Sequence, residues 1–436
     1  MSIYVEIVED SKQFTDILAV ASGYEIDEVA YTYVEIDEVG IQFYGRDWMK
    51  LRLMKLVYDL RIEIDEVVAT IYVEIDEVYT IYVEIDEVGI QFTQRLDQSE
   101  RMAEEKVLNW GICGAGKISN DFCSAMMTLS RYEREHKITA IAARSQEKAQ
   151  KFADIFEAPK AYGSYTDVAN DPEIEIVYIG VIHTEHVRLS MMMLEAGKHV
   201  VCEKPLAPTW QECKKVLDYA KEKKLLFLEA AWSRFFPVYD AIKEEVNSGK
   251  LGDISMVTTQ FCVPIMSVER LNKKDLMGGV LLDIGIYCIQ FACHVYGEMP
   301  EKIIATGSLN EEGVDEDGCV ILLYSGNRKA SLVYSGKTVF GNNTATILGS
   351  KGQIFVDDCF WCPKSVKLTE TTLENKIPEG PSPYNFYNSG GLRYEADHAF
   401  KLIRSGQLDS PKYGYKDVEM IHKIIDEISK QIGLKY

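Results

Sequence analysis

Three ionisable side chains in this sequence have the types and positions needed to move a proton. Lys204 belongs to the segment E-K-P, which directly follows an apolar run, 199–202, that predicts a strand. Asp283 and Tyr287 stand four residues apart in a run, 279–295, that predicts a helix, so a carboxylate and a phenol should share one helix face. A nearby ammonium favours the phenolate and would lower the pKa of a tyrosine from about 10. The set suits general acid–base chemistry, and a tyrosine that simply packs in the core is the alternative.

A glycine-rich turn upstream has the spacing of a phosphate cradle. Residues 107–119 read V-L-N-W-G-I-C-G-A-G-K-I-S, an apolar run followed by Gly111, Gly114 and Gly116 and then by the start of a helical pattern. Without a Cβ, such a turn can adopt positive φ and bring backbone N–H groups to a pyrophosphate at the positive end of the helix dipole. Ser119 replaces the last glycine of G-x-G-x-x-G, a small residue that departs from the strict form. The turn predicts a dinucleotide site, with an ordinary glycine loop as the alternative.

The order of the elements around this turn indicates a parallel sheet. Apolar strand runs at 138–143, 175–181 and 199–202 are separated by helical runs such as 185–196. Strand, helix and strand repeated in this way require right-handed crossovers, and ligands then bind at the carboxyl ends of the strands. The sequence therefore predicts an α/β dinucleotide-binding domain with Lys204 at the ligand edge of its sheet.

Cations and imidazoles at other strand ends bear on which cofactor binds. Arg144 ends the run 138–143, and Lys148 follows four residues later. Cations here suit the 2′-phosphate of NADP, whereas an acidic residue would suit the ribose hydroxyl of NAD; a solvated pair of surface cations is the alternative. His183 and His186 follow a later strand in the form H-x-x-H, but the sequence offers no third plausible metal ligand nearby. We expect them near the cofactor, or as polar loop residues, and no metal.

The composition limits the class of protein. The 436 residues are 47% hydrophobic, enough for two or more domains with real cores, and no run reaches the roughly 18 to 20 apolar residues of a membrane span. The chain starts with acidic residues rather than basic ones, so we expect no secretory signal and a cytosolic location. Its ten cysteines are dispersed, and the C-x-x-C of Cys359 and Cys362 lacks a second pair, so we expect reduced thiols and no structural zinc.

The net charge of −21 is concentrated in the first 105 residues. This leader carries 25 acidic and 8 basic residues, a net of −17, and the rest of the chain a net of −4, so no basic surface for nucleic acid is expected. The leader repeats E-I-D-E-V five times at irregular spacing. We interpret it as a poorly ordered low-complexity extension unconnected with catalysis; an acidic interaction tail, short strands such as 71–76 and a helix at 44–60 are alternatives.

The second half of the chain changes to the alternation typical of strands, with turns between the runs. This pattern predicts a large, mostly antiparallel open sheet. The chain should thus divide into the leader, 1–105, a Rossmann NADP-binding domain, 106–233, and an α+β domain for substrate binding and dimerisation, 234–436. The strand runs are 254–261, 302–309, 320–324, 329–334, 344–348 and 353–356.

Several longer motifs resemble one known family. A-Y-G-S-Y, C-E-K-P-L, E-A-A-W-S-R-F-F-P, L-L-D-I-G-I-Y-C-I-Q-F and C-F-W-C-P occur in this order after the leader. Together they resemble the glucose-fructose oxidoreductase/inositol dehydrogenase (Gfo/Idh/MocA) family, whose members join a Rossmann domain to an open-sheet domain. The resemblance implies NADP-dependent oxidation of secondary alcohols, with trans-dihydrodiols of arenes and pentoses such as D-xylose as substrates. It also implies a homodimer formed through the C-terminal sheet.

The motifs and the resemblance together define an expected site. The resemblance implies a substrate pocket lined by Trp232, Phe261, Trp361 and Phe386. We expect the cofactor to be bound by Gly111, Gly114, Gly116, Lys117, Ile118, Arg144, Lys148, His183, His186, Glu203 and Lys204.

Oxidation of a secondary alcohol needs a hydride acceptor and a base for the hydroxyl proton, and the nicotinamide would supply the first. We expect Tyr287 to be the base, with Lys204 lowering its pKa and binding the substrate hydroxyl, and Asp283 positioning the substrate or Lys204. Lys204 as the base, with Tyr287 orienting the substrate, is the alternative. Two other functions fit the same motifs: oxidation of another sugar or cyclitol, and a non-catalytic NADP(H)-sensing regulator, which would need no proton-transfer groups.

Overall fold

The computed structural model describes residues 107–129 and 132–436 and, before residue 107, the backbone of six short strands. The chain divides into two compact units, Met1–Glu105 and Lys106–Tyr436. In the first unit, four strands form a sheet in the order β2-β1-β5-β6, and β3 pairs with β4. These strands are β1 (Ser2–Val5), β2 (Ala19–Val20), β3 (Tyr33–Asp37), β4 (Gly40–Tyr44), β5 (Thr70–Ile75) and β6 (Tyr79–Glu84).

The expectations for the leader are tested at few positions. Strand β5 covers most of the alternating run 71–76, which predicted a strand. The helix expected at 44–60 lies outside the described residues, apart from Tyr44, which ends β4. That the leader is poorly ordered and unconnected with catalysis also stays a prediction.

Six parallel strands form the first sheet of the second unit. Their order is β12-β11-β10-β7-β8-β9, and every pairing is parallel. The strand order reverses between β7 and β10, which is the switch point where dinucleotides bind in such sheets. The predicted Rossmann sheet is therefore confirmed. Its strands are β7 (Leu108–Cys113), β8 (His136–Ala142), β9 (Lys160–Tyr162), β10 (Ile176–Ile179), β11 (His199–Glu203) and β12 (Phe227–Ala230).

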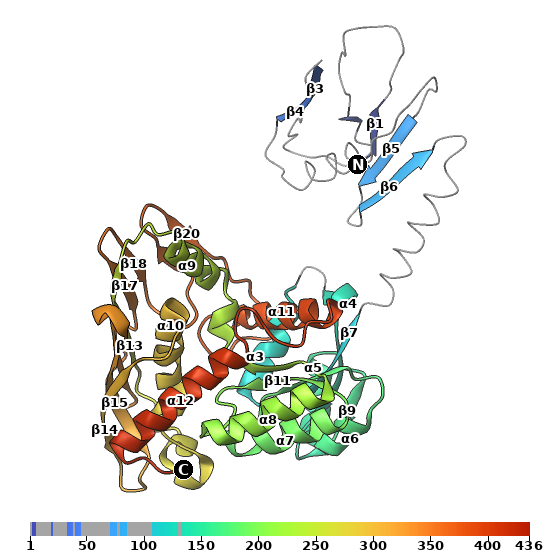
Figure 1. Cartoon of the computed structure of the whole chain (residues 1–436). Coiled ribbons are helices and arrows are strands. Elements are labelled where there is room, and N and C mark those ends of the chain that lie inside the picture. The colour runs from blue at the N-terminus through green and yellow to red at the C-terminus, as the bar shows by residue number, and fades with distance from the viewer. Residues whose placement is uncertain are drawn as a thin grey trace. The chain divides into compact units, whose positions relative to one another are not determined.

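Helices cover both faces of this sheet because its central strands are apolar on both sides. All four residues of β10 are buried, as are the side chains of Trp110 and Ile112 in β7. Figure 1 shows α7 and α8 side by side, while α3 packs against α11. The helices between the strands are α3 (Lys117–Met126), α4 (Tyr132–Glu135), α5 (Gln146–Ile155), α6 (Tyr165–Asn170), α7 (His186–Glu195) and α8 (Trp210–Lys223).

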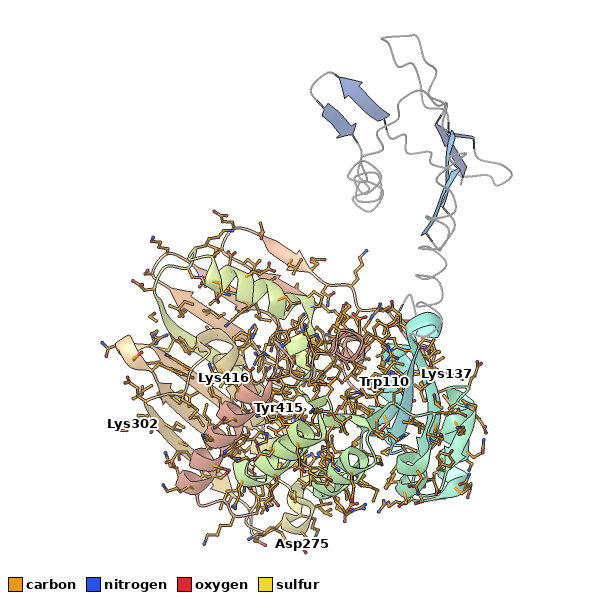
Figure 2. All side chains as sticks on the ribbon, turned by 45° about the vertical axis from the view of Figure 1, so that its right-hand side comes forward. Trp110, Lys137, Asp275, Lys302, Tyr415 and Lys416 are labelled. Atoms are coloured by element: carbon orange, nitrogen blue, oxygen red, sulfur yellow. The ribbon has the colours of Figure 1, made fainter. Side chains whose placement is uncertain are left out.

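Eight strands form the second sheet, in the order β14-β15-β16-β13-β17-β18-β19-β20. All neighbours are antiparallel except β13 and β16, so the predicted, mostly antiparallel sheet is confirmed. In Figure 2, Lys302 projects from its outer edge, whereas Trp110 of the first sheet lies among crowded side chains. The strands are β13 (Ile254–Cys262), β14 (Lys302–Leu309), β15 (Asp315–Leu323), β16 (Lys329–Ser335), β17 (Ala345–Gly349), β18 (Gln353–Val356), β19 (Ser365–Lys367) and β20 (Thr372–Glu374).

Helices cover one face of the second sheet and join it to the first. Helix α10 packs on β13 and β16, and α12 contacts α8, α10 and the edge strand β14, as Figure 1 shows for α12 in red. The alternating burial of β16, in which Ala330, Leu332 and Tyr334 are buried, follows from this one-sided cover. These helices are α9 (Pro237–Asn247), α10 (Ile286–Tyr296), α11 (Arg393–Arg404) and α12 (Tyr415–Ile432).

The helix predicted at 279–295 differs in one detail that matters for the site. It begins with a π-helical turn, Leu281–Gly285, and continues as α10. Wide turns of this kind often mark functional sites. The segment Lys274–Tyr296 is long and apolar enough to cross a membrane by its composition, but 83% of its most apolar window is buried inside the protein. Its hydrophobicity is that of a core helix.

Candidate active site

A cleft of about 1360 Å³ opens at the carboxyl ends of the parallel strands. All the site residues expected from the sequence line it, except Gly111. Gly111 lies inside β7, where an added Cβ would come within 2.8 Å of Val168 Cγ1. The expectation that Gly111 belongs to the turn is therefore wrong, because its small size serves the packing of the strand.

The turn between β7 and α3 fits a pyrophosphate. Gly114 has a φ of +112°, and a Cβ there would lie 2.7 Å from the carbonyl oxygen of Gly180. Gly116 is the N-cap of α3, whose first N–H groups receive no side-chain cap. A Cβ on Gly116 would meet nothing closer than 3.9 Å, so the space before the helix is open. Uncapped N–H groups at a helix N-terminus bind anionic oxygens, so this turn fits the diphosphate of a nicotinamide dinucleotide.

Arg144 and Lys148 follow β8, and both side chains are exposed where they line the cleft. The Ser145 hydroxyl accepts a hydrogen bond from the Lys148 backbone N–H at 3.4 Å and so caps helix α5. This cap fixes the backbone between the two cations. Both charges thus stand at the strand end where a Rossmann fold binds the adenosine ribose.

The two histidines after β10 lie at the floor of the cleft. His186 Nδ1 lies 2.8 Å from the Pro205 carbonyl oxygen, and its Nε2 lies 3.2 Å from that of Val181. Burial lowers the pKa of both rings, that of His183 to about 3, so both are neutral. A neutral ring has one N–H, so His186 donates to only one of these two carbonyl oxygens.

Lys204 is held at the cleft by Asp283 and by the ring of Tyr287. Its Nζ donates to the Asp283 backbone oxygen at 2.7 Å, lies 3.8 Å from Asp283 Oδ1 and lies 5.0 Å from the centre of the Tyr287 ring. Burial lowers the pKa of Lys204 below its usual 10.5, although the carboxylates of Asp283 and Glu203 oppose this shift. The ammonium of Lys204 is thus easier to deprotonate than that of an exposed lysine.

Arg270 is a site residue that the sequence reasoning missed. Its Nη2 donates to Asp283 Oδ1 at 2.8 Å, and it lines the same cleft. Burial by itself would raise the pKa of Asp283, but the positive charges of Lys204 and Arg270 outweigh burial and lower it to about 2. Asp283 is therefore an ionised carboxylate shared by two cations. Arg270 lies in a short 3-10 turn, Glu269–Asn272, where neither periodicity nor a motif marks it.

Tyr287 faces the cleft from the first turn of α10. Its hydroxyl oxygen accepts a hydrogen bond from Trp232 Nε1–H at 2.7 Å. Burial, followed by the carboxylates of Glu203 and Asp283, raises the pKa of Tyr287 well above 10. The fall in this pKa that the sequence predicts is not found in the structure, because burial and the two carboxylates raise it. Tyr287 is a neutral phenol whose O–H can donate to a ligand.

Aromatic rings line the cleft beside Tyr287. Phe261 stacks on Trp361 with ring centres 3.6 Å apart and an angle of 12° between the ring planes. Trp232 and Phe386 line the same cleft, and Phe386 is 49% exposed whereas the other three rings are buried. Flat apolar faces of this kind suit a ring-shaped ligand with hydroxyl groups at its edge.

One cluster in the described part of the chain has three potential metal ligands close together: Glu135, His136 and Asp397. His136 Nδ1 accepts a hydrogen bond from Trp110 Nε1–H at 3.1 Å, and burial lowers the pKa of His136 to about 4. The neutral ring therefore carries its proton on Nε2, which then has no lone pair for a metal. This chemistry disfavours a metal at the cluster, and the absence of a metal cofactor stays a prediction.

Comparison with known proteins agrees with this geometry. Residues 108–230 match the model of an oxidoreductase family with an NAD-binding Rossmann fold, and residues 239–355 match the Gfo/Idh/MocA C-terminal domain. Levoglucosan dehydrogenase, solved with NADH and levoglucosan, has a TM-score of 0.66 at 22% identity and covers 75% of this chain and 98% of its own. A 3-ketoreductase from Actinomadura kijaniata, solved with NADP and TDP-benzene, has a TM-score of 0.62 at 20% identity with the same coverage. These two likenesses show the fold.

Curated relatives are more similar in sequence. The trans-1,2-dihydrobenzene-1,2-diol dehydrogenase of Xenopus laevis is 42% identical over 328 residues, which are 75% of this chain and 98% of the relative. The enzyme of the same name from Homo sapiens is 38% identical over 330 residues, 76% of this chain and 98% of the relative. The chain is thus an oxidoreductase that binds a nicotinamide cofactor and acts on CH–OH donors. It belongs to the Gfo/Idh/MocA family.

Proposed function

We propose that this protein is an NADP-dependent dehydrogenase that oxidises secondary alcohols, namely trans-dihydrodiols of arenes and pentoses such as D-xylose. The position of Lys204 carries the proposal: its Nζ lies 3.8 Å from Asp283 Oδ1 and beside the Tyr287 ring, in the same cleft as the glycine turn. When bound there, the oxidised nicotinamide accepts the hydride of the alcohol. The names of the relatives favour aromatic diols as substrates.

Lys204 and Tyr287 form the proton-transfer pair of this proposal. Burial makes Lys204 easier to deprotonate and Tyr287 harder, so the neutral amine of Lys204 is the base that takes the alcohol proton. The Tyr287 hydroxyl, fixed by Trp232, donates a hydrogen bond to the substrate oxygen. The ionised Asp283 holds Lys204 in place and stabilises the ammonium that forms. These roles are the reverse of those we first expected for Tyr287 and Lys204.

The preference for NADP rests on charge. Arg144 and Lys148 are exposed at the end of β8 and line the cleft, whereas the exposed Glu147 beside Lys148 is not among the lining residues. A guanidinium can bind a phosphate through two parallel hydrogen bonds, which the hydroxyl of NAD cannot reciprocate. The pair therefore favours the 2′-phosphate.

A homodimer through the outer face of the second sheet is part of the proposal. Ile304 of β14 is 47% exposed and Leu348 of β17 is 36% exposed, and strand alternation directs both away from the buried face. Exposed apolar side chains on an open sheet favour burial against another sheet. Light scattering coupled to size-exclusion chromatography should give twice the chain mass, and a single chain mass at micromolar concentration would contradict this proposal.

The experiment for the catalytic proposal is a substrate and cofactor comparison with purified protein. The formation of reduced cofactor is followed with trans-benzene dihydrodiol and with D-xylose, each offered with NADP and with NAD. We expect turnover with NADP, a higher kcat/KM than with NAD, and the aromatic diol as the better substrate. If NADPH binds but neither alcohol reacts, the proposed substrates are wrong, and a regulator that senses the cofactor becomes the better hypothesis.

A further inference from the structure

The buried Asp121 of α3 is bonded to a segment distant in sequence that carries one wall of the cleft. Its Oδ1 accepts hydrogen bonds from the Asn385 backbone N–H and from Asn385 Nδ2, both at 2.8 Å. Its Oδ2 accepts the backbone N–H groups of Asn385 at 3.0 Å and Phe386 at 2.9 Å. Asp121 itself is 0% exposed, whereas Asn385 and Phe386 are exposed. The buried carboxylate thus fixes two consecutive peptide groups of an exposed segment.

Other polar side chains of α3 bind the start of the same segment, residues 382–386. Ser124 Oγ donates to the Ser382 carbonyl oxygen at 2.6 Å and accepts the Ser382 backbone N–H at 3.0 Å. Asn120 Nδ2 donates to the Pro383 carbonyl oxygen at 3.0 Å. These bonds attach the 382–386 segment to α3 at its beginning, while Asp121 alone among them reaches Phe386.

The two ends of this arrangement face the two ligands of the proposed reaction. The uncapped N-terminus of α3, at Gly116, borders the part of the cleft that fits the cofactor diphosphate. The ring of Phe386 lines the same cleft, where we expect it to contact the substrate, and it is 49% exposed. The backbone that carries this ring is held by Asp121, which accepts hydrogen bonds from the N–H groups of Asn385 and Phe386, and by Ser389, whose Oγ donates to the Phe386 carbonyl oxygen at 3.1 Å.

We propose that Asp121 is a positioning residue for substrate specificity, which acts by fixing the backbone of Asn385 and Phe386 so that the Phe386 ring closes the substrate wall. This inference rests on the proposed function and names the residue that sets its preference for ring-shaped alcohols. A substrate with a large apolar face gains more from the ring than a pentose does. Asp121 therefore acts on the binding of the aromatic diol and leaves cofactor binding and proton transfer to the residues already described.

The test uses Asp121→Asn, which keeps the shape of the side chain but places an NH₂ group opposite a backbone N–H. The variant should raise the KM for the aromatic diol about tenfold, lower kcat less than about threefold and change the KM for D-xylose less than the KM for the diol. The Kd of NADPH should stay within about twofold. A purely structural role would lower thermal stability, kcat and NADPH affinity together, and that result would overturn the inference.

Two further variants test whether Asp121 positions the Phe386 ring or only helps to attach residues 382–386 to α3. Ser124→Ala removes the bonds to Ser382, four residues from Phe386, and should leave the KM for the diol unchanged. Phe386→Ala removes the ring, so adding Asp121→Asn to it should raise the KM no further, because the two changes act on one contact. A KM raised equally by Ser124→Ala, or multiplied in the double variant, would contradict the role given to Asp121.

A measurement that needs no turnover keeps this inference apart from the proposed function. Hydrogen exchange of the peptide that contains Asn385 and Phe386 should be faster in Asp121→Asn than in the native chain, with exchange in the parallel sheet unchanged. If the native protein oxidises neither alcohol but this difference appears, the proposed substrates fail and the positioning of Phe386 stands. Equal exchange in both proteins would overturn the positioning itself.

Discussion

Replacing Tyr287 with phenylalanine separates the two candidate bases. The ring stays, with its centre 5.0 Å from Lys204 Nζ and 5.8 Å from that of Phe261, and the hydroxyl bonded to Trp232 is lost. If the neutral amine of Lys204 is the base, the loss is one hydrogen bond to the substrate oxygen. Such a bond contributes about 0.5–1.5 kcal/mol, or roughly 2- to 13-fold in kcat/KM. Loss of a general base would instead cost about 10²- to 10⁴-fold.

The pH profile of kcat gives a second, independent readout of the same variant. Because the pKa of Lys204 lies below 10.5, the rate should rise with pH along a limb that ends below 10.5, in both the native enzyme and Tyr287→Phe. A phenolate base would give a limb above pH 10, since the pKa of Tyr287 is raised, and this limb would vanish in the variant. Trp232→Phe is the control, because it removes the partner of the hydroxyl but keeps an aromatic ring. A loss beyond about hundredfold in Tyr287→Phe, with Trp232→Phe near native activity, would refute Lys204 as the base.

Three further changes test other parts of the site. Gly114→Ala should weaken NADPH binding at least about tenfold in a fluorescence titration, because φ of +112° and the nearby carbonyl leave no room for a Cβ; an unchanged Kd would contradict the cradle. Arg144→Asp should weaken NADPH much more than NADH, and equal weakening would remove the basis for NADP preference. The pKa of Asp283 falls from 3.8 to about 2 on folding, so its ionised form adds about 2 kcal/mol above pH 4, which is lost as the pH falls towards 2. Asp283→Asn should lack this contribution, and urea unfolding between pH 4 and pH 2 that matches the native protein would contradict the pairing with Lys204 and Arg270.

The sequence was most informative where backbone geometry dictates the residue type. A turn at positive φ needs glycine, which is why Gly114 marked the cofactor site, and apolar runs flanked by helices marked the parallel strands. The i, i+4 spacing predicted that Asp283 and Tyr287 lie together, and both line the cleft although the first turn is π-helical rather than α-helical. Gly111 shows the limit of this reasoning, because a glycine can serve packing as well as a turn.

The site features that could not be predicted from the sequence depend on tertiary contacts. Arg270 meets Asp283 through a short 3-10 turn with no periodic pattern, and Asp121 meets residues more than 260 positions away. Whether a pKa rises or falls depends on burial, and burial raises the pKa of Tyr287, whereas its cationic neighbour predicted a fall. In each case the sequence does not show which side chains are buried next to one another in the folded chain.

Lys204→Met tests the central claim most directly. Methionine keeps an apolar stem of similar length but cannot accept a proton, so NADP-linked oxidation of the diol should fall by about 10²- to 10⁴-fold. The account predicts that NADPH binding, measured by fluorescence on the same preparation, stays within a few fold of the native protein, because the glycine turn and Arg144 are untouched. Turnover within tenfold of the native rate, with NADPH bound normally, would contradict the assignment of Lys204 as the base.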